Sequence, residues 1–505
     1  MNVATPSVVI LCAGVAGLAT FSARAASAPD GKSKTPQVQA QAQTQAPAQP
    51  ADRNFGSTLR KRSIAGDLKL IDAVNLALHQ NPEVLRSVRE IERTHGQIVE
   101  ARAQALPHLS VDTTLNRQDS KLTGASGGFT DSLTIAFSVK QVLYSGGQVS
   151  SALEVAKLTQ DVTFFNLRDI LDRTVSDVRK QFAQVLVTAA LIDVAQESVE
   201  LAAKQLEDAS NRFAAGTVPR FNVLRAEVEL ASVKPGLIRA KNDYLIAQLQ
   251  LAKLLGLDAL PDGKLSFKCV GDLTVRDIPF GLADGLSLSR ARRASLKSQR
   301  QQILVEKERI NIANAGYKPR IDAHADYQFV SKGSSRNLES YLNGYFLGIT
   351  GKWNIFDSFE TAGQVSQAKA RFESALLTYD ESVLQVELEV QRSYADLLQF
   401  RETIESQQKN VQQALEALRL AQERLAAGAG TQLEVLDARV VLTRARQTAL
   451  QAQGDYVRSL AEYERATATN TVYAESFKDP LSILEKRVLK QSPAEAFSPA
   501  DLFKK

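Results

Sequence analysis

The stretch RLAAGAGTQLEVLDARVVL, residues 424–442, reads as the end of one helix, a turn of small residues and the start of a second helix. Nearly the same text, RFAAGTVPRFNVLRAEVEL, occurs at residues 212–230, and the two stretches agree at nine of nineteen positions. The shift that places Arg212 on Arg424 also aligns residues 106–111 with residues 318–323 without a gap. Self-similarity over this distance indicates that one unit of roughly two hundred residues is written twice.

The composition favours long helices and argues against a nucleic-acid-binding protein. Only 6% of the 505 residues are aromatic, whereas Ala, Gln and Leu are abundant, which suits helical packing. The formal charge of +5 comes from residues 1–65, where seven Lys and Arg face two Asp, and the rest of the chain is neutral. A neutral body is a poor partner for a polyanion. Cys12 and Cys269 are the two cysteines, and since Cys12 lies in an apolar leader, the mature chain cannot form an intrachain disulfide.

The N-terminal residues predict secretion. Residues 8–21 form an apolar run that is too short to span a bilayer, and two A-x-A cleavage sites follow it, ending at Ala25 and Ala28. The segment before the run has no Lys or Arg, which is atypical. We expect residues 1–28 to be a secretory signal peptide and the Gln-, Ala- and Pro-rich residues 29–65 to be a disordered spacer.

Each copy changes its hydrophobic period after an initial helical segment. In residues 109–115 and 133–139 apolar positions alternate with polar ones, and the second copy repeats this alternation. A period of two predicts strands with one apolar and one polar face, and each strand is near the length that crosses a membrane when tilted. The strands alone leave open the alternative of a soluble four-stranded sheet whose outer face is solvated.

After each strand pair comes a helical stretch of unusual length. Residues 148–215 contain no Pro or Gly, and residues 361–427 contain a single Gly. Helices of this length need partners, and apolar residues at a 4, 3, 7 spacing predict a coiled-coil seam in the second copy. The seam residues are Val411, Leu415, Leu418 and Leu425. Pro235 predicts a kink or break in the return helix of the first copy only.

Turn residues are expected to stop and restart these helices. Gly216 and Gly428 are suited to end a helix, because glycine adopts the left-handed conformation required there. Pro219 suits the first position of a new helix. Thr431 and Glu434 have the spacing of a capping box, which predicts the start of the last helix.

The expected organisation is a tandem pair of repeats. Repeat 1 covers residues 66–266, repeat 2 covers residues 283–470, a linker occupies 267–282 and a C-terminal tail occupies 471–505. The expected elements of repeat 1 are an initial helix, strands at 108–119 and 131–143, a long helix at 146–215 and a return helix at 219–257. Those of repeat 2 are an initial helix, strands at 320–331 and 344–355, a long helix at 358–427 and a return helix at 431–468.

Strands of membrane length impose a requirement on the assembly. An open four-stranded sheet in lipid would leave the N–H and C=O groups of both edges without partners. Closure therefore needs strands from other copies. A barrel of eight strands fills with side chains, whereas twelve strands from three copies leave a lumen. The long helices of each copy would then continue the same tube.

The features that carry a family resemblance are the tandem duplication, the Asn81-Pro82-Glu83 triplet, the LYSGGQ and IFDSFE junctions that begin at Leu143 and Ile355, and the RLAAGAGTQLEVLDA turn. In order and spacing, over residues 66–470, they resemble the TolC-like outer-membrane channel family of efflux and secretion proteins, the outer membrane factors.

The resemblance implies a mainly helical fold with membrane strands, assembled as a homotrimer. Three chains would form a twelve-stranded β-barrel in the outer membrane, continued by a periplasmic α-helical barrel. The implied partners are outer-membrane lipid, a periplasmic adaptor protein and an inner-membrane transporter of the ABC, RND or a similar class. The implied cargo is small toxic molecules, proteins or polysaccharides, as in multidrug efflux or type I secretion.

Glu434 and Asp437 are the candidate site residues, because they lie one helical turn apart just past the turn that opens the last helix. The alternative is structural, since Glu434 completes a capping box and both acids favour the positive end of a helix. The resemblance implies a ring of six carboxylates at the closed periplasmic entrance of a trimer. The first copy has Asn222 and Arg225 at the matching positions, which puts its part in the ring in doubt. Gly430 stands where relatives carry a basic residue that latches the entrance.

The small residues of the two turns are candidates for docking the adaptor. As loops they could also be turns and nothing more. The residues are Ala215, Gly216, Thr217 and Val218 in the first copy, and Ala427, Gly428, Ala429, Gly430 and Thr431 in the second.

The sequence predicts no enzyme, no cofactor and no metal site. The four histidines are scattered, and neither H-E-x-x-H nor G-x-S-x-G occurs. The main rival to a channel is a soluble periplasmic coiled-coil adaptor or scaffold protein. Adaptors usually carry one helical hairpin, whereas this chain has two complete copies with a strand pair in each. The number of hairpins and strand pairs therefore favours the channel.

Overall fold

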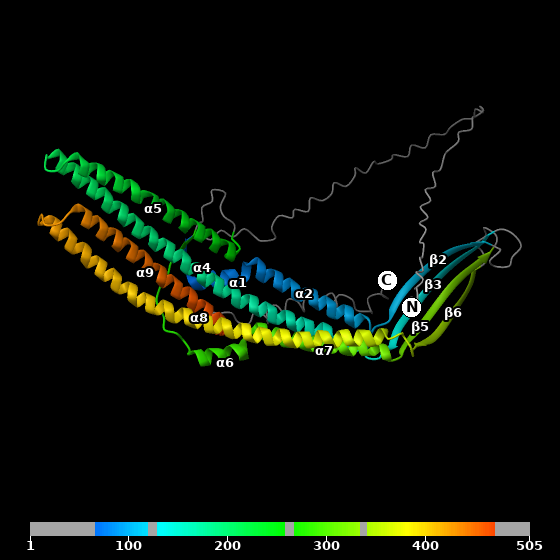
Figure 1. Ribbon diagram of the computed structural model, residues 1–505. Coiled ribbons are helices and arrows are strands. Elements are labelled where there is room, and N and C mark those ends of the chain that lie inside the picture. Colours follow the sequence, from blue (N-terminus) through cyan, green and yellow to red (C-terminus); the bar gives the residue numbers. More distant parts are fainter. Residues whose placement is uncertain (1–65, 120–128, 258–266, 334–340, 470–505) are drawn as a thin grey trace, which may run out of the picture. The chain divides into compact units, whose positions relative to one another are not determined.

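Figure 1 shows a computed structural model of the chain, which describes residues 66–119, 129–257, 267–333 and 341–469. The expected signal peptide at 1–28, the spacer at 29–65 and the tail at 471–505 lie outside the described residues, so these three expectations stay predictions. The described residues of both repeats belong to one compact unit.

The two repeats contain the same series of elements. In repeat 1 these are β1 (Gly66–Leu68), α1 (Leu70–Gln80), α2 (Pro82–Ala103), β2 (His108–Asp119), β3 (Phe129–Tyr144), α4 (Gln148–Ala214) and α5 (Arg220–Leu255). In repeat 2 they are β4 (Phe267–Cys269), α6 (Leu282–Arg292), α7 (Ala294–Asn314), a 3-10 turn (Ala315–Tyr317), β5 (Arg320–Gly333), β6 (Tyr341–Lys352), α8 (Glu360–Ala426) and α9 (Gln432–Ala466).

The four long strands form one antiparallel sheet in the order β2-β3-β5-β6. The central pair joins the repeats, because Ile135 of β3 lies opposite Phe329 of β5. Leu109, Leu115 and Ile349 project from one face and are largely exposed to solvent in the single chain. The outer edges of β2 and β6 have no partner strand among the described residues.

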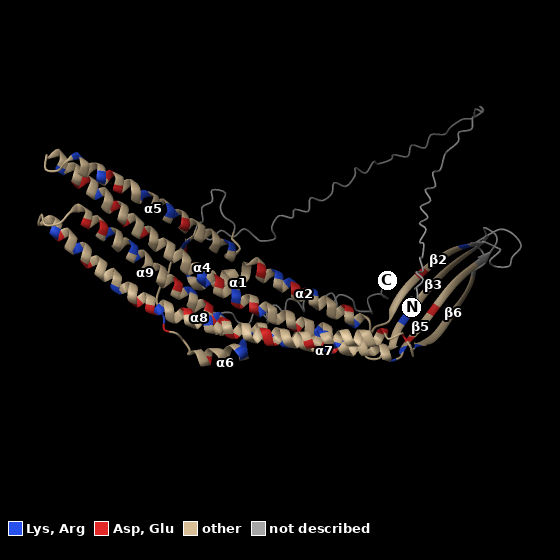
Figure 2. Ribbon diagram, in the orientation of Figure 1, with Lys and Arg blue, Asp and Glu red and all other residues tan. Residues whose placement is uncertain are grey.

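The helices form a layer in which α4 and α8 are the longest members (Figure 1). α5 packs along α4, and α9 packs along α8. α4 also contacts α7 and α9, so the second repeat packs directly against the first. Charged residues are spread along the helices and are sparse on the strands (Figure 2). None of the described helices has a stretch that is both long and apolar enough to cross a lipid bilayer.

Two buried clusters hold the helix layer together. The first lies between α1, α2, α4 and α5 and includes Val178, Leu251 and Leu255. The second lies between α8 and α9 and includes Leu397 and Tyr463. Burial of such side chains contributes about 1.5–3 kcal/mol each. The two helical hairpins, α4 with α5 and α8 with α9, are therefore the stable units of the layer.

The segment expected to be a linker contains an unpredicted strand. β4 pairs in parallel with β1, with Leu68 opposite Cys269. Burial raises the pKa of the Cys269 thiol to about 12, so the thiol stays protonated and unreactive at neutral pH. Three-residue strands carry too little periodicity to be detected from sequence, and their partners lie about two hundred residues apart.

The end of β6 also differs from expectation. The strand stops at Lys352, three residues before the expected end at 355. The Trp353 indole N–H donates to the carbonyl of Tyr317, and the chain then turns through Ser358 and Phe359, which both have positive φ, into α8. The apolar residues after Lys352 extended the alternating pattern without belonging to the strand.

The expected break at Pro235 is wrong, because α5 is one continuous helix through this residue. Proline removes a single backbone donor, and Pro235 lies on an exposed part of the helix while α5 packs along α4. Packing of the whole helix outweighs this local loss. Pro219 is the residue before the helix rather than its first residue.

The coiled-coil seam of α8 is incompletely covered in the single chain. Val411, Leu418 and Leu425 are partly covered, and Leu415 is half exposed. Leu415 and Leu418 both line a cavity against α4, α5 and α9, so the seam faces these helices without being tightly packed against them.

We predict opposite effects from two glycine substitutions in α8. Gly428 has φ +75° just past the helix end, whereas Gly363 lies inside the helix with open space around it. Gly428→Ala should destabilise the helix end by about 1 kcal/mol, and Gly363→Ala should stabilise the first turns by up to about 1 kcal/mol. Hydrogen-exchange mass spectrometry of peptides covering the two ends of α8 measures both effects. Equal exchange rates in the wild type and the Gly428→Ala variant would contradict the prediction.

Candidate functional site

Each helical hairpin ends in the same backbone motif. At the end of α4 the N–H of Gly216 donates to Phe213 O at 2.9 Å and the N–H of Thr217 donates to Arg212 O at 2.9 Å. Gly216 has φ +74°, as this motif requires. The hydroxyl of Thr217 donates to the same Arg212 carbonyl at 2.9 Å. The first turn is therefore closed by its own backbone and is exposed to solvent.

The second turn repeats this geometry and adds a requirement for glycine at a second position. The N–H of Gly428 donates to Leu425 O, and the N–H of Ala429 donates to Arg424 O at 2.9 Å. A Cβ atom on Gly430 would lie 3.0 Å from the Arg424 Cβ and from the Leu425 N. Any side chain at position 430 would have to push the last turn of α8 aside.

Glu434 and Asp437 are both exposed at the start of α9, on the same side of the second turn. The Thr431 hydroxyl accepts a hydrogen bond from the Glu434 N–H at 3.3 Å, which supplies the first half of the capping box. The Glu434 carboxylate lies 3.6 Å from Arg424 Nη1. Asp437 has no hydrogen bond or ion pair within the described part of the chain. Asp437 is thus the less restrained of the two charges.

The first-copy counterparts differ in chemistry and in exposure. Asn222 and Arg225 are both partly buried in the first turns of α5. The structure therefore brings two exposed acids to one hairpin tip and none to the other at the matching positions.

A row of polar contacts joins the two hairpins, and sequence reasoning missed it. Arg446 of α9 lies 2.6 Å from Glu197 of α4, and Arg458 Nη1 donates to Gln184 Oε1 at 2.8 Å. Closer to the tip, Arg439 Nη1 donates to Gln205 Oε1 at 2.7 Å. The residue numbers of each pair add to nearly the same value, as expected for antiparallel helices. That regularity could be found from sequence only once α4 and α9 were known to be neighbours.

Arg439 lies in an unusual environment. Its Nε has no hydrogen-bond partner, and burial lowers the pKa of the guanidinium, with Glu229 partly offsetting the effect. It lines a cavity of about 590 Å³ between the four tip helices, together with apolar residues including Leu201, Leu418 and Leu436. The contact between the hairpins is therefore polar and incompletely packed, unlike the apolar contacts within each hairpin.

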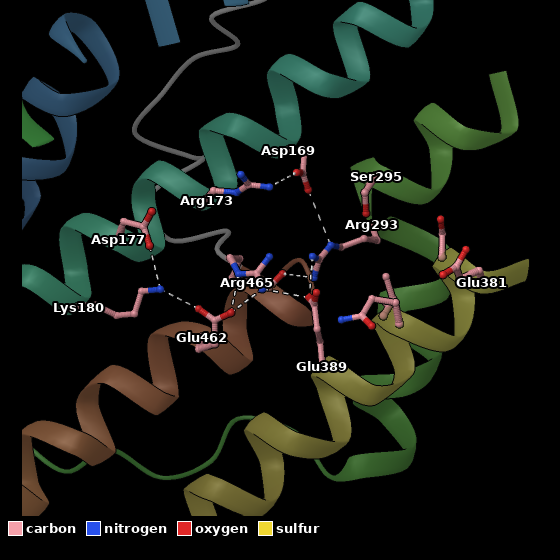
Figure 3. A pocket seen from close by; sticks show the side chains of 13 residues that line it. Asp169, Arg173, Asp177, Lys180, Arg293, Ser295, Glu381, Glu389, Glu462 and Arg465 are labelled. Atoms are coloured by element: carbon pink, nitrogen blue, oxygen red, sulfur yellow. Dashed lines mark hydrogen bonds and ion pairs between the residues drawn. The ribbon is translucent and has the colours of Figure 1, made fainter. Parts of the chain in front are cut away.

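A denser charge cluster lies where α9 ends and α7 begins (Figure 3). Arg293 is almost fully buried, and its Nη2 lies 2.9 Å from Glu389 Oε2. Arg465 contacts the same Glu389 oxygen at 3.0 Å. In the same cluster, Lys180 Nζ lies 3.0 Å from Glu462 Oε2 and 2.8 Å from Asp177 Oδ1. These contacts join α4, α7, α8 and α9 at one point.

Two opposing effects set the charge state of Glu462 in this cluster. Burial alone would raise the pKa of its carboxyl, but hydrogen bonds and charges from Arg465 and Lys180 lower the pKa to about 2. A carboxyl with a lowered pKa contributes stability above its ordinary value near pH 4.5, and this contribution is lost as the pH falls toward 2. The ion pairs are therefore intact throughout the neutral range.

The two repeats use matching residues to join stacked helices. In repeat 1, Asn81 Nδ2 donates to Leu254 O at 2.9 Å and links α2 to the end of α5. In repeat 2, Arg293 Nη1 donates to Ala466 O at 3.3 Å and links α7 to the end of α9. The shift that relates the two repeats places Asn81 on Arg293 and Leu254 on Ala466. The longer arginine keeps the same link and adds the ion pair with Glu389.

Comparison with known proteins agrees with this architecture. The family model described as "Outer membrane efflux protein" matches residues 73–257 and 285–469. The chain belongs to the outer membrane efflux protein family. The two matched segments are related, at both of their limits, by the same shift that places Arg212 on Arg424, which confirms the duplication.

Individual relatives cover most of the chain at moderate identity. Protein CyaE of Bordetella pertussis is 25% identical over 75% of this chain and 80% of its own length. The cobalt-zinc-cadmium resistance protein CzcC of Cupriavidus metallidurans is 25% identical over 76% of this chain and 86% of its own length. The CmeC outer membrane channel of Campylobacter jejuni is similar in structure, with a TM-score of 0.70 and 16% identity over 81% of this chain and 88% of its own.

These findings confirm the expected family, the mainly helical fold with membrane strands and the location in the outer membrane. The protein is an export channel component of that membrane, and the rival interpretation as a soluble periplasmic adaptor is wrong. The family consists of channel proteins rather than enzymes. The roles of the individual tip residues are not decided by the family match.

We predict that Arg293→Asn, which restores the residue found in repeat 1, destabilises the protein by about 2 kcal/mol. Asparagine can keep the link to Ala466 but leaves Glu389 with one partner fewer. Thermal unfolding followed by circular dichroism in detergent measures the change. The matched control is Arg290→Asn, which removes an exposed contact with Glu387 and should cost less than about 1 kcal/mol. Equal unfolding temperatures for the two variants would contradict the prediction.

Proposed function

We propose that three copies of the chain close into one continuous export conduit, a twelve-stranded barrel followed by a helical tunnel. The observation that carries this proposal is a sheet in an outer-membrane protein that has a mainly apolar face and two edges without a partner strand among the described residues. In lipid both edges need partners. Three copies supply twelve strands, enough for a lumen, whereas eight strands leave room only for side chains.

The faces of the sheet suit such a barrel. Along β5 the side chains of Asp322, His324 and Asp326 share one face, and their cross-strand partners include Lys140 and Thr350. The opposite face carries most of the exposed apolar residues. A barrel with the apolar face toward lipid would place the charged face around the passage.

The helix layer has complementary free faces at its two sides. On α5, Phe221, Val228 and Ile238 are each about two-thirds exposed. Along the part of α8 that is level with α5, Leu398 and Leu420 are 42% and 47% exposed. Apolar rows of this kind require burial, and a neighbouring copy of the same layer would bury α5 against α8. Closure of the helices and closure of the sheet then follow from one three-fold arrangement.

At the hairpin tips the proposed conduit has its periplasmic entrance. Glu434 and Asp437 of three chains would form a ring of six carboxylates, which favours cations and resists passive leakage of anions. We propose Asp437 as the stronger contributor, because Glu434 has an arginine beside it. Asn222 and Arg225 would add no negative charge.

The exposed turn residues are proposed to dock a periplasmic adaptor that connects to an inner-membrane transporter of the ABC, RND or a similar class. The residues are Ala215, Gly216, Thr217, Val218, Ala427, Gly428, Ala429, Gly430 and Thr431. Their small side chains would let helices of a partner approach closely. The proposed cargo classes are small toxic molecules, proteins and polysaccharides, as in multidrug efflux or type I secretion.

We predict that replacing Glu434 and Asp437 together with Ala lowers the cation preference of single channels in planar bilayers by about twofold or more and raises their conductance. Asp437→Ala alone should produce most of the change. Reversal potentials in a salt gradient and single-channel currents measure the two quantities.

The matched control for this experiment is Glu402→Ala with Glu405→Ala, a pair of exposed acids with the same spacing farther along α8. The control should leave both quantities unchanged. Unaltered conductance and cation preference in the tip variant would remove the proposed role of Glu434 and Asp437.

A further inference from the structure

A cavity of about 510 Å³ lies at the junction between strands and helices. It is bounded by the end of α7, the starts of α4, β5 and α8, and the end of β6. Its lining includes five basic side chains and no acidic one. The five are Arg309, Lys318, Arg320, Lys352 and Arg371.

Two of the five cations have partners outside the lining. Arg309 Nη1 lies 3.0 Å from Glu306 Oε1, and Arg320 Nε lies 2.9 Å from Asp322 Oδ2. These acids neutralise two positive charges on the rim. They do not neutralise the positive charges of the other three basic side chains.

Lys318, Lys352 and Arg371 have no hydrogen bond or ion pair within the described residues. The cavity therefore carries three uncompensated positive charges in each chain. The start of α4 adds the positive end of a helix dipole, because Ser145 and Gln148 also line the cavity. These side chains are exposed, so water and salt screen part of their mutual repulsion, and a multivalent anion in the cavity would relieve the remainder.

The acids at the start of α8 are engaged elsewhere. Asp357 Oδ2 accepts a hydrogen bond from the Thr361 N–H at 2.8 Å, and the Thr361 hydroxyl and N–H together lower the pKa of that carboxyl. Glu360 Oε1 accepts a hydrogen bond from Gln364 Nε2 at 3.2 Å. Neither acid belongs to the lining of the cavity.

Two glycines fix the elements that form the cavity. A Cβ atom on Gly146 would lie 2.8 Å from the Lys318 Cβ, and one on Gly316 would lie 2.7 Å from Thr361 Oγ1. Only glycine allows the start of α4, the end of α7 and the start of α8 to approach so closely. The cavity is therefore a built feature of the fold.

The cavity adjoins the polar face of the sheet. Arg320 is paired with Lys352 across β5 and β6 and lies on the same strand face as Asp322. The neighbouring Ile321 and Ile349 project from the opposite, apolar face, as strand alternation requires. A dissolved solute could reach the cavity from the polar side.

The first repeat lacks this cluster. The matching positions of repeat 1 are Gln97, Leu106, His108, Lys140 and Thr159. Only Lys140, which matches Lys352, carries a full positive charge at neutral pH. The basic cavity is therefore a feature of the second repeat alone.

We propose that this cavity binds a multivalent oxyanion of the phosphate or sulfate type, such as a phosphate group on a solute that passes the junction. Three unpaired cations around one space match the charge and the several acceptor oxygens of such a group. A lipid headgroup offers the same chemistry, but the polar-face position favours a dissolved anion. All lining residues come from one chain, so the site does not depend on closure of the trimer.

Isothermal titration calorimetry of the full-length assembly in an uncharged detergent, with inorganic pyrophosphate at low salt, tests the proposal. Wild type should bind saturably. The triple variant Lys318→Gln, Lys352→Gln and Arg371→Gln should bind at least about tenfold more weakly. Lys140→Gln is the matched control from repeat 1 and should keep the wild-type affinity. Trp353 is the single tryptophan of the chain, so unchanged emission would show that the junction of each variant is folded.

The source of the anion is decided by repeating the titration in nanodiscs. Equal pyrophosphate affinity in zwitterionic and in phosphatidylglycerol-containing discs would assign the site to dissolved anions. Weaker pyrophosphate binding in the anionic discs would overturn that assignment in favour of a headgroup. Absence of saturable binding by wild type in detergent, or equal binding by the folded triple variant, would overturn the site itself.

Discussion

Unpaired backbone groups at the two edges of the sheet constrain the rest of this structure. The outer edges of β2 and β6 have no partner among the described residues, and hydrocarbon offers none. A single chain cannot solve this problem, because its four strands are too few for a barrel. The need for sister strands explains why the helix layer carries apolar rows on α5 and α8 that nothing in the described part of the chain covers. Neighbouring copies of the chain would meet both needs, because their strands would pair with the sheet edges and their helices would cover the apolar rows.

Divergence between the two repeats shows where this protein gained its particular properties. The shared positions keep the turns and the links between stacked helices. Glu434 and Asp437 replace Asn222 and Arg225, so acidic charge is confined to one of the two tips at these positions. Arg293 replaces Asn81 and adds an ion pair to a link that the simpler residue already makes. The basic cavity is likewise confined to repeat 2. The two repeats therefore share the scaffold and differ in these charges.

Features set by short-range chemistry could be predicted from the sequence, and features set by distant contacts could not. Gly216 and Gly428 end their helices as expected, because a positive φ near a helix end is a local demand. The strands could be predicted from alternating apolar and polar residues, because this pattern is also local in the sequence. The break expected at Pro235 does not occur, since packing along α4 outweighs one lost hydrogen bond.

The polar row between the hairpins and the cluster at Arg293 join residues that are far apart in the sequence. Arg446 and Glu197, for example, are separated by 249 positions. Their proximity depends on which helices become neighbours, and no local pattern encodes that choice. The five cations of the junction cavity come from four separate elements or their flanks, so they too become visible only in three dimensions. The proximity of Glu434 and Asp437 could be predicted because both lie within one turn of the same helix.

The number of chains in the detergent-extracted particle tests the central claim most directly. Native mass spectrometry should give a particle of three chains, because only sister strands can satisfy both edges of the sheet in the membrane. A homogeneous single chain that stays dispersed after the detergent is removed would contradict the account.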